Sequence, residues 1–226
     1  MAVEILFSDN HLVAAAKPAG LATVPDETGD PSLLDEVREW IRVTAGKPGN
    51  VFVGVVHRLD RPVSGLVLFA RTSKAASRLA AAWRTRTVEK IYLGIVAGPV
   101  AEDEGTIALS LSKISSAEKG WRMIAAKKGK PAVTHWRKLA TRGGLTLVEF
   151  RPETGRTHQI RVHAEHGLGN ALLGDPVYGD GKGAPRTMLH ARALAIPREG
   201  KPPVAALAPL PDDFRALGFG DADLGA

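Results

Sequence analysis

The 226-residue chain contains no cysteine, which excludes disulfide bonds, thiolate nucleophiles and cysteine-ligated zinc sites. It also has no apolar run near the ~20 residues that a membrane-spanning helix needs. The first ten residues include Glu4 and Asp9 but no basic segment, unlike a secretory signal peptide. These absences predict a soluble, cytoplasmic protein without a membrane partner.

Charge is present in quantity but is unevenly distributed along the chain. The formal net charge is +6, although residues 1–50 hold four Lys/Arg against eight Asp/Glu. Residues 71–100 hold six Lys/Arg against one Glu, and residues 113–142 hold nine against one. Two basic stretches indicate a positive surface that binds a polyanion, and nucleic acid is the favoured partner.

Hydrophobic periodicity predicts an α+β fold, with a mixed, largely antiparallel central sheet and flanking helices. Strand-like runs occupy residues 4–7, 12–16, 51–56, 66–70, 90–97, 106–111, 133–139 and 145–150. Helical spacing occurs at residues 31–45 after Asp30 as the cap, at residues 73–86, and at residues 157–166. We expect a mobile basic loop at residues 126–131 and a frayed tail over residues 211–226. The length and the 44% hydrophobic content suit a single domain over residues 1–226.

A short charged segment between two apolar runs is the first candidate for a functional site. Residues 51–56 and 66–70 have the length and β-branched content of buried strands, and the segment between them contains turn-forming residues. Its ionisable residues are His57, Arg58, Asp60 and Arg61. By itself, such a segment is equally compatible with a solvated turn that holds a local Asp–Arg pair.

A second charged segment, residues 151–163, enters the third predicted helix with three arginines and two histidines. Arg156 and His158 lie near the helix N-terminus, where backbone amides favour an anion such as phosphate. His158, His163 and His166 are spaced by five and three residues, which does not match a pair of metal ligands at i and i+4. We therefore expect no metal site.

Three segments resemble the motifs of a known family. His57-Arg58-Leu59-Asp60, followed by Ser64-Gly65-Leu66, resembles the HRLDxxTSGL signature of the RluA-type RNA pseudouridine synthases. Lys90-Ile91-Tyr92 is similar to the second motif of that family, and residues 154–163 are similar to the third. Weaker similarities at residues 9–20, 174–179 and 189–191 extend the match over residues 4–197. The resemblance implies the pseudouridine synthase fold, with a catalytic cleft across the sheet.

The resemblance also implies a role for each matched residue. Asp60 would be the catalytic aspartate, Tyr92 the aromatic side chain that stacks on the target uracil, and Arg161 the basic partner of Asp60. Arg58 matches the arginine that fills the space left by the flipped nucleotide. We expect the other substrate-binding residues to be His57, Lys90, Arg156 and His158.

The chemistry of the implied reaction agrees with these roles. Converting uridine to pseudouridine breaks a carbon–nitrogen glycosidic bond, turns the base and rejoins it through carbon, so no metal or small-molecule cofactor is expected. A neighbouring arginine favours the charged form of a carboxylate. A stacked tyrosine holds the detached uracil by about 1–3 kcal/mol, and a cation such as Arg58 offsets part of the energy of base flipping. Val63 stands where the family usually has Thr, which removes a hydroxyl but no catalytic atom.

Two other functions are compatible with parts of this pattern. A non-catalytic RNA-binding protein that helps RNA to fold would have the same basic surface. A metal-dependent nuclease or phosphoesterase would use the histidines together with Asp175. Retained RNA affinity without activity in an Asp60→Asn variant separates the enzyme from the first alternative, and sensitivity to chelators identifies the second.

The predicted partner is structured RNA, in the form of a stem–loop of rRNA or tRNA, and we expect a monomer. The KPaG-like segment begins at Lys17, so we expect no N-terminal S4-like RNA-binding domain. Substrate selection would then depend on the catalytic domain itself. Sugar attack, base attack and a glycal route all use the same aspartate and are equally compatible with the sequence.

Overall fold

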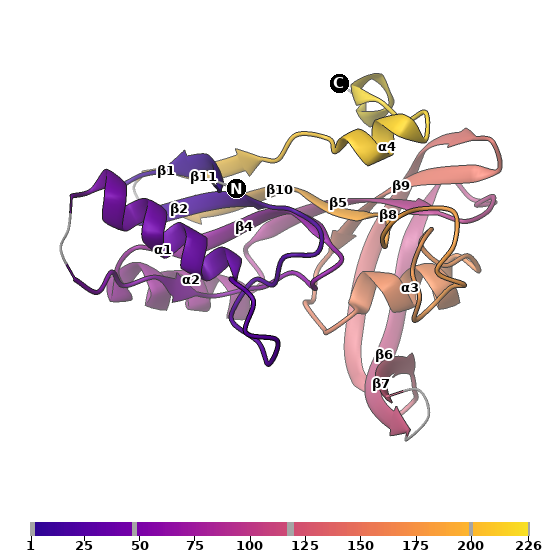
Figure 1. Ribbon diagram of the computed structural model, residues 1–226. Coiled ribbons are helices and arrows are strands. Elements are labelled where there is room, and N and C mark those ends of the chain that lie inside the picture. Colours follow the sequence, from indigo (N-terminus) through magenta and orange to yellow (C-terminus); the bar gives the residue numbers. More distant parts are fainter. Residues whose placement is uncertain (1–2, 47–48, 117–119, 199–200, 226) are drawn as a thin grey trace. The chain divides into compact units, whose positions relative to one another are not determined.

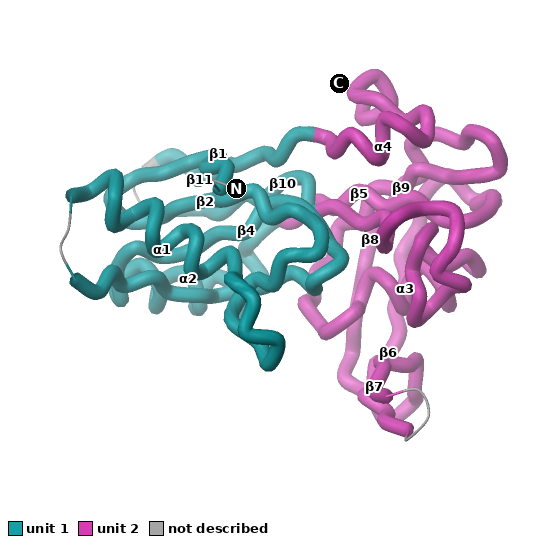
Figure 2. Tube along the Cα trace, viewed as in Figure 1, with its two compact units in different colours: residues 1–89, 191–209 teal, residues 90–190, 210–226 magenta. Residues whose placement is uncertain are grey.

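The computed structural model describes residues 3–46, 49–116, 120–198 and 201–225. It divides the chain into two compact units, which Figure 2 distinguishes by colour. Unit 1 comprises residues 1–89 and 191–209, and unit 2 comprises residues 90–190 and 210–226. The organisation of residues 1–226 as one catalytic domain stays a prediction.

Unit 1 is built on strands paired in the order β1–β2–β4–β10, with β3 also paired to β4 and β11 to β10 (Figure 1). The strands are β1 (Glu4–Ser8), β2 (Leu12–Lys17), β3 (Gly54–Val55), β4 (Ser64–Ala70), β10 (Leu189–Arg198) and β11 (Lys201–Leu207). Its helices are α1 (Leu33–Thr44) and α2 (Ser73–Arg84). The predicted strands at residues 4–7, 12–16 and 66–70 are confirmed.

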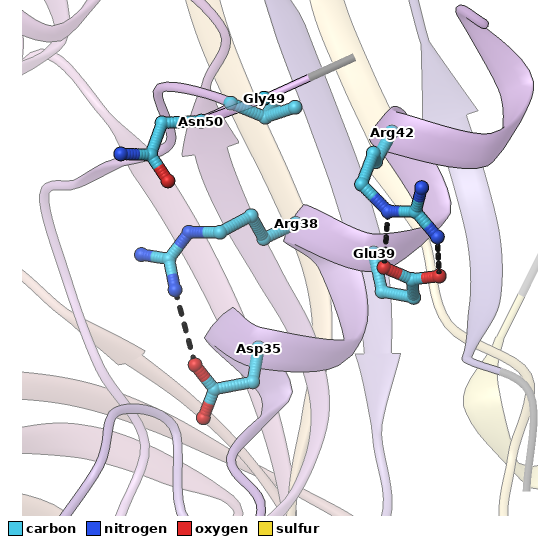
Figure 3. Close-up of a pocket in the computed structure, with 7 residues that line it drawn as sticks. Asp35, Arg38, Glu39, Arg42, Gly49 and Asn50 are labelled. Atoms are coloured by element: carbon cyan, nitrogen blue, oxygen red, sulfur yellow. Dashed lines mark hydrogen bonds and ion pairs between the residues drawn. The ribbon is translucent and has the colours of Figure 1, made fainter. Parts of the chain in front are cut away.

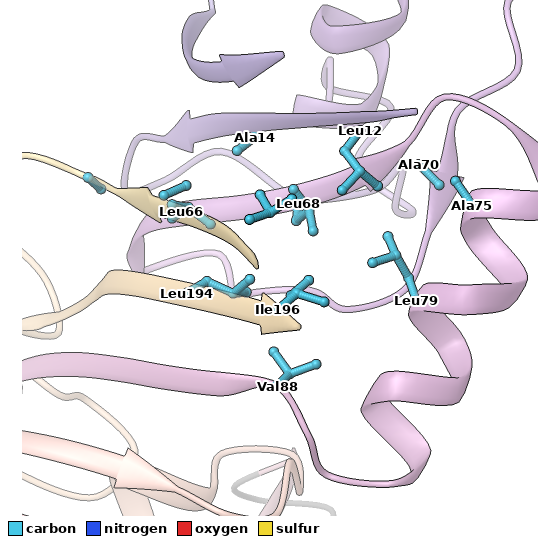
Figure 4. Close-up of a cluster of buried hydrophobic side chains, with 13 residues drawn as sticks. Leu12, Ala14, Leu66, Leu68, Ala70, Ala75, Leu79, Val88, Leu194 and Ile196 are labelled. Atoms are coloured by element: carbon cyan, nitrogen blue, oxygen red, sulfur yellow. The ribbon is translucent and has the colours of Figure 1, made fainter. Parts of the chain in front are cut away.

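Strand β4 is the centre of the unit 1 core, because every one of its residues is buried. Leu66 and Leu68 point to one face, where they pack in the same cluster as Ala75 and Leu79 of α2 (Figure 4). Phe69, which points to the opposite face, is also fully buried. A strand covered on both faces needs a continuous apolar sequence, which is the pattern that residues 66–70 show.

The start of α1 differs from the prediction that Asp30 caps the helix. Ser32 is the N-cap: its hydroxyl accepts a hydrogen bond from the Asp35 backbone N–H, and the Asp35 carboxylate accepts one from the Ser32 N–H. A reciprocal pair of this kind satisfies two helix N–H groups, which Asp30 could not do from two residues upstream. Helix α2 begins after Thr72, as predicted.

The prediction of a buried strand over residues 51–56 is wrong. Only Gly54 and Val55 pair, with Ala70 and Phe69 respectively. Phe52 is 51% exposed and Val55 is 39% exposed. An apolar run without a strand alongside its whole length does not form a core strand, since its backbone groups lack ladder partners.

Unit 2 is built on strands paired in the order β5–β9–β8–β6–β7. The strands are β5 (Glu89–Val96), β6 (Glu104–Ser116), β7 (Gly120–Ala125), β8 (Lys130–Arg142) and β9 (Leu145–Pro152), and the helices are α3 (Gln159–Gly167), α4 (Asp212–Ala216) and the 3-10 helix η1 (Asp221–Leu224). The strands predicted in this unit are confirmed, and β6, β8 and β9 are longer than expected. Strand β7 is an addition to the predicted strands. Every strand pairing with a described register in this unit is antiparallel.

Two segments of unit 2 are more ordered than the sequence suggested. In place of a basic loop over residues 126–131, a tight turn closes with a 2.8 Å hydrogen bond from Gly129 N–H to the Ala126 carbonyl, and β8 begins at Lys130. The tail after Leu210 is not frayed, because Phe214 and Phe219 are fully buried beside Leu93 and Leu147. Across the described residues, no helix is long and apolar enough to cross a membrane.

Candidate active site

The predicted site residues are divided between the two units. His57, Arg58 and Asp60 belong to unit 1, whereas Tyr92 and Arg161 belong to unit 2. The remaining predicted substrate-binding residues, Lys90, Arg156 and His158, also belong to unit 2. The approach of Asp60 to Arg161 and Tyr92 therefore stays a prediction, and each half of the site is described separately.

The backbone on both sides of Asp60 is fixed by hydrogen bonds. The Thr23 hydroxyl accepts from the Leu59 N–H at 3.1 Å and donates to the Leu59 carbonyl at 2.8 Å. On the other side, the Arg61 carbonyl accepts from the Gly20 N–H at 2.8 Å and from the fully buried Lys17 ammonium at 3.1 Å. The Asp60 side chain itself is half-buried.

The Arg61 side chain points to an acidic loop. Its guanidinium lies 2.6 Å from the Asp26 carboxylate and 3.3 Å from that of Asp30. Hydrogen bonds from Thr28 and Arg61 lower the pKa of Asp26 to about 2. Asp30, predicted as a helix cap, instead pairs with Arg61 and, together with Asp26, holds the turn that contains Asp60 against the acidic loop.

His57 connects the turn to β4 and α2. Its Nε2 accepts a 2.8 Å hydrogen bond from the Leu68 N–H, which requires that nitrogen to be unprotonated. The ring stacks on Trp83, with 4.7 Å between ring centroids. These contacts position the turn, while the predicted contact of His57 with RNA stays a prediction. Arg58, the next residue, is exposed.

A close approach of two backbone segments accounts for the glycine at position 65 in the first motif. Its φ is +118°, and a Cβ built on it would lie 2.3 Å from the Ala191 carbonyl oxygen. Only glycine adopts this backbone conformation at such a close approach without strain. The turn that carries Asp60 can therefore enter β4 directly alongside β10.

In unit 2, the buried side chain of Gln159 organises the entry to α3. Its Oε1 accepts from the Thr154 hydroxyl at 2.7 Å and from the Arg156 N–H at 2.9 Å, while its Nε2 donates to the Val133 carbonyl at 3.0 Å. His158, the residue before the helix, has a left-handed φ of 53°. Sequence reasoning assigned Gln159 no role, although it lies inside the third motif.

Arg161 has a buried partner that the sequence did not assign to it. Its Nε and Nη2 each lie 2.7 Å from an oxygen of Asp175, and the two residues are 3% and 0% exposed. Asp175 also accepts hydrogen bonds from the N–H groups of Val177 and Tyr178. The guanidinium lies 5.0 Å from the centroid of the Tyr178 ring. The orientation of Arg161 is thus fixed before any substrate binds.

The remaining predicted residues of unit 2 lie on β5 and in the segment that leads into α3. Tyr92 is half-buried on β5, in register with Phe150 of β9. The Lys90 ammonium is 3.5 Å from the Thr154 carbonyl, and Arg156 Nε donates to the Pro131 carbonyl at 3.1 Å. Lys90 and Arg156 therefore both border the segment that leads into α3.

A pocket lined mainly by charged residues also occurs in unit 1, but it contains none of the predicted site residues. Its lining comes from one side of α1 and from residues 49–51 (Figure 3). Arg42 there pairs with Glu39 at 2.6 Å, and Arg38 pairs with Asp35 at 3.1 Å. Because the cations are already paired with acids, this pocket offers little charge to a ligand.

The hydrogen bonds that the Asp175 carboxylate accepts argue against its use as a metal ligand. Both of its oxygens accept hydrogen bonds from Arg161, and one also accepts from two backbone amides. Across the residues that the structure describes, no group of three or more His, Asp or Glu side chains is arranged to hold a metal ion.

Comparison with known proteins identifies a common family. The model of the family described as RNA pseudouridylate synthase matches residues 11–166. An uncharacterized RNA pseudouridine synthase of Zymomonas mobilis is 46% identical over 221 residues, which covers 97% of this chain and 99% of that protein. Ribosomal large subunit pseudouridine synthase D of the same organism is 36% identical over 85% of this chain and 61% of its own length. Human RNA pseudouridylate synthase domain containing 4 has a similar structure, with a TM-score of 0.77 at 25% identity, covering 93% of this chain and 90% of that one.

Proposed function

The chain belongs to the RluA-type RNA pseudouridine synthases, a family of isomerases, and we propose that Asp60 is its catalytic carboxylate. The observation that carries this proposal is the fixation of the backbone on both sides of Asp60 by Thr23, Gly20 and Lys17. A carboxylate that reacts must be held in one position while its oxygens stay accessible. Asp60 is half-buried and lies between two backbone positions, Leu59 and Arg61, that these hydrogen bonds fix.

The proposed reaction is an isomerisation in which every atom is retained. The bond between N1 of uracil and C1′ of the ribose breaks, the base turns, and a bond between C5 and C1′ forms. One proton leaves C5 and one is bound at N1, so no oxidant, reductant or water is consumed. Asp60 assists the breaking of the glycosidic bond, while Tyr92 stacks on the detached base.

Arg161 supplies the positive charge that keeps Asp60 ionised in this proposal. Its guanidinium donates two hydrogen bonds to Asp175, and a guanidinium carries five N–H donors in all. A guanidinium near a carboxylate favours the charged form. Arg58, which is exposed, occupies the space that the flipped nucleotide leaves in the RNA.

The proposed substrate is a stem–loop of structured RNA, with RNA of the large ribosomal subunit as the first candidate. Several relatives that are 34–37% identical to this chain are named ribosomal large subunit pseudouridine synthase D. A tRNA stem–loop is the second candidate. In this proposal the protein acts in the cytoplasm, as a monomer, and requires no cofactor.

An Asp60→Asn variant tests the proposed function. We expect it to form no pseudouridine on ribosomal RNA or tRNA, because a neutral amide cannot supply the anionic oxygen. Its affinity for the same RNA should stay within about twofold of the wild type, since one side chain without phosphate contacts contributes little to binding. Asp103→Asn is a matched control, because the Asp103 side chain is 90% exposed, and this variant should stay fully active.

The wild-type protein and a strain without it complete the test. Pseudouridine mapping of ribosomal RNA and tRNA should reveal positions that lose modification when the protein is absent. Undiminished turnover by Asp60→Asn would rule out the proposed role of this carboxylate. A wild-type protein that binds RNA but modifies none of it would instead support the RNA-folding alternative.

A further inference from the structure

A tryptophan is exposed in a basic part of unit 2, where the proposed reaction gives it no role. Trp121 on β7 is 44% exposed, although large aromatic side chains are highly buried on average. Lys113 of β6 and His158 before α3 both contact its ring. We propose that these three residues, termed the Trp121 platform, bind an unpaired nucleotide of the substrate RNA. This inference rests on the proposed function, since it takes RNA as the ligand.

The strand register places the lysine and the tryptophan on one face of the hairpin. Trp121 lies opposite Ser115, and Lys113 lies opposite Met123, so Lys113 and Trp121 are diagonal neighbours. The Lys113 ammonium is 4.6 Å from the centroid of the Trp121 ring. An ammonium at this distance makes a cation–π interaction with the face of the indole ring.

His158 and Tyr178 hold the platform in a fixed orientation. The imidazole of His158 stacks on Trp121 with 5.0 Å between centroids and 27° between planes. His158 Nδ1 is 2.9 Å from the Tyr178 hydroxyl, which also accepts a 3.0 Å hydrogen bond from the Met123 N–H. The hairpin is therefore attached to Tyr178 by its backbone and to His158 by its aromatic ring.

Charge and ring chemistry together favour a nucleotide as the occupant. The segment of residues 113–142 carries nine Lys/Arg, and Lys127, Lys128 and Lys130 near the hairpin are exposed. Proteins that bind single-stranded RNA combine such cations for the phosphates with aromatic rings for the bases. A base that stacks on Trp121 would replace the Lys113 ammonium, whose flexible stem then lets it reach the adjacent phosphate.

Tyr178, which supports the platform, also contacts the proposed catalytic residue Arg161. The Tyr178 ring that supports His158 also contacts the guanidinium of Arg161, 5.0 Å from its centroid. All of these residues belong to unit 2, so their spacing is set within one compact body. The platform thus contacts a nucleotide that flanks the target, and it contributes to binding rather than to the chemical step.

The test compares a ligand that has bases with one that has only charge. We would measure binding of fluorescein-labelled oligouridylate of about ten nucleotides by anisotropy, and binding of inorganic polyphosphate by competition. Trp121→Ala should raise the Kd for oligouridylate by about 5–150-fold, the equivalent of one lost base stack. Its Kd for polyphosphate should stay within about twofold, because the phosphate-binding lysines are unchanged.

Three further variants make the result specific. Trp121→Phe keeps an aromatic face and should retain most of the affinity, whereas Trp121→Leu keeps apolar bulk and should not. Phe52→Ala is the matched control, because Phe52 is a comparably exposed aromatic residue of unit 1. An unchanged oligouridylate Kd in both Trp121→Ala and Trp121→Leu would overturn the proposal, as would an equal loss of polyphosphate affinity. The first result would leave a protein partner as the occupant.

Failure of this inference and failure of the proposed function give different results. Anisotropy reports binding without turnover, while pseudouridine formation is measured separately on the wild-type protein. Loss of oligouridylate affinity in Trp121→Ala, with no product from the wild type, would support the platform and reject the enzyme activity. Normal wild-type turnover, with no effect of Trp121→Ala or Trp121→Leu on oligouridylate binding, would support the enzyme activity and reject the platform.

Discussion

Replacing Asp175 with asparagine should destabilise the protein strongly as well as reduce its activity. Asp175 and Arg161 are 0% and 3% exposed and are joined by two hydrogen bonds of 2.7 Å. Removing one charge of such a pair leaves the other buried and uncompensated, at about 3–5 kcal/mol. For a chain of this length, each kcal/mol lowers the melting temperature by about 2–4 °C, so we expect a decrease of about 6–20 °C.

Thermal unfolding followed by circular dichroism measures this effect. Glu39→Gln is the matched control, because it removes the carboxylate of an arginine pair with similar geometry whose side chains are 50% and 59% exposed. That variant should melt as the wild type does, since solvent screens exposed pairs. A double variant with Asp175→Leu and Arg161→Met should recover much of the stability, because neither of these two buried positions then carries a charge, but should stay inactive. An Asp175→Asn melting temperature within about 2 °C of the wild type would refute the reasoning.

Three other predictions concern residues away from that pair. Burial lowers the pKa of His163 from 6.5 to about 4. As the pH falls, the imidazole is therefore protonated in the unfolded state before it is protonated in the folded state. The free energy of unfolding should decrease by on the order of 3 kcal/mol between about pH 6.5 and 4. We would measure the free energy of unfolding by urea across this pH range. It should depend less on pH in His163→Gln than in the wild type, and an equal dependence on pH in both proteins would contradict the role given to His163. Gly65→Ala should lower the urea midpoint sharply, because its Cβ would meet the Ala191 carbonyl, whereas Gly220→Ala has open space and should be neutral. Phe214→Ala should destabilise by about 3–5 kcal/mol through loss of a fully buried ring; a loss below about 1 kcal/mol would mean that the tail is not part of the core.

The sequence predicted those parts of the fold that depend on local pattern. Residues 66–70 are apolar at every position because β4 is covered on both faces. A continuous run of apolar residues predicts a strand of this kind. Helix α2 was predictable because residues 73–86 show helical spacing of apolar side chains, and Thr72 is its N-cap in the structure. The run at residues 51–56 looked identical to a buried strand, but strand formation depends on a partner that lies far away in the sequence.

The functional side chains were predictable as motif members, but their partners were not. The third motif predicts a role for Arg161. Its ion-pair partner, Asp175, lies 14 positions further along the chain, in a loop that follows α3. Nothing in the spacing of the charges distinguishes Asp175 from the exposed Asp180. The same applies to Trp121, whose contact with His158 arises from the packing of α3 against a hairpin strand that was not predicted.

The two aspartates of the motif segments differ in a way that bears on their roles. Asp175 is fully buried, and its oxygens accept four hydrogen bonds, from Arg161 and from the N–H groups of Val177 and Tyr178. A carboxylate saturated in this way is poorly placed to attack a ribose or to bind a metal ion, because every approach would first require breaking a charge-assisted hydrogen bond. Asp60 is half-buried, and hydrogen bonds with Thr23 and Lys17 fix the backbone of its neighbours Leu59 and Arg61. The burial and the hydrogen bonds of Asp175 therefore indicate that it positions Arg161. The proposed role of Asp60 in the chemical step is tested separately, by the activity of Asp60→Asn.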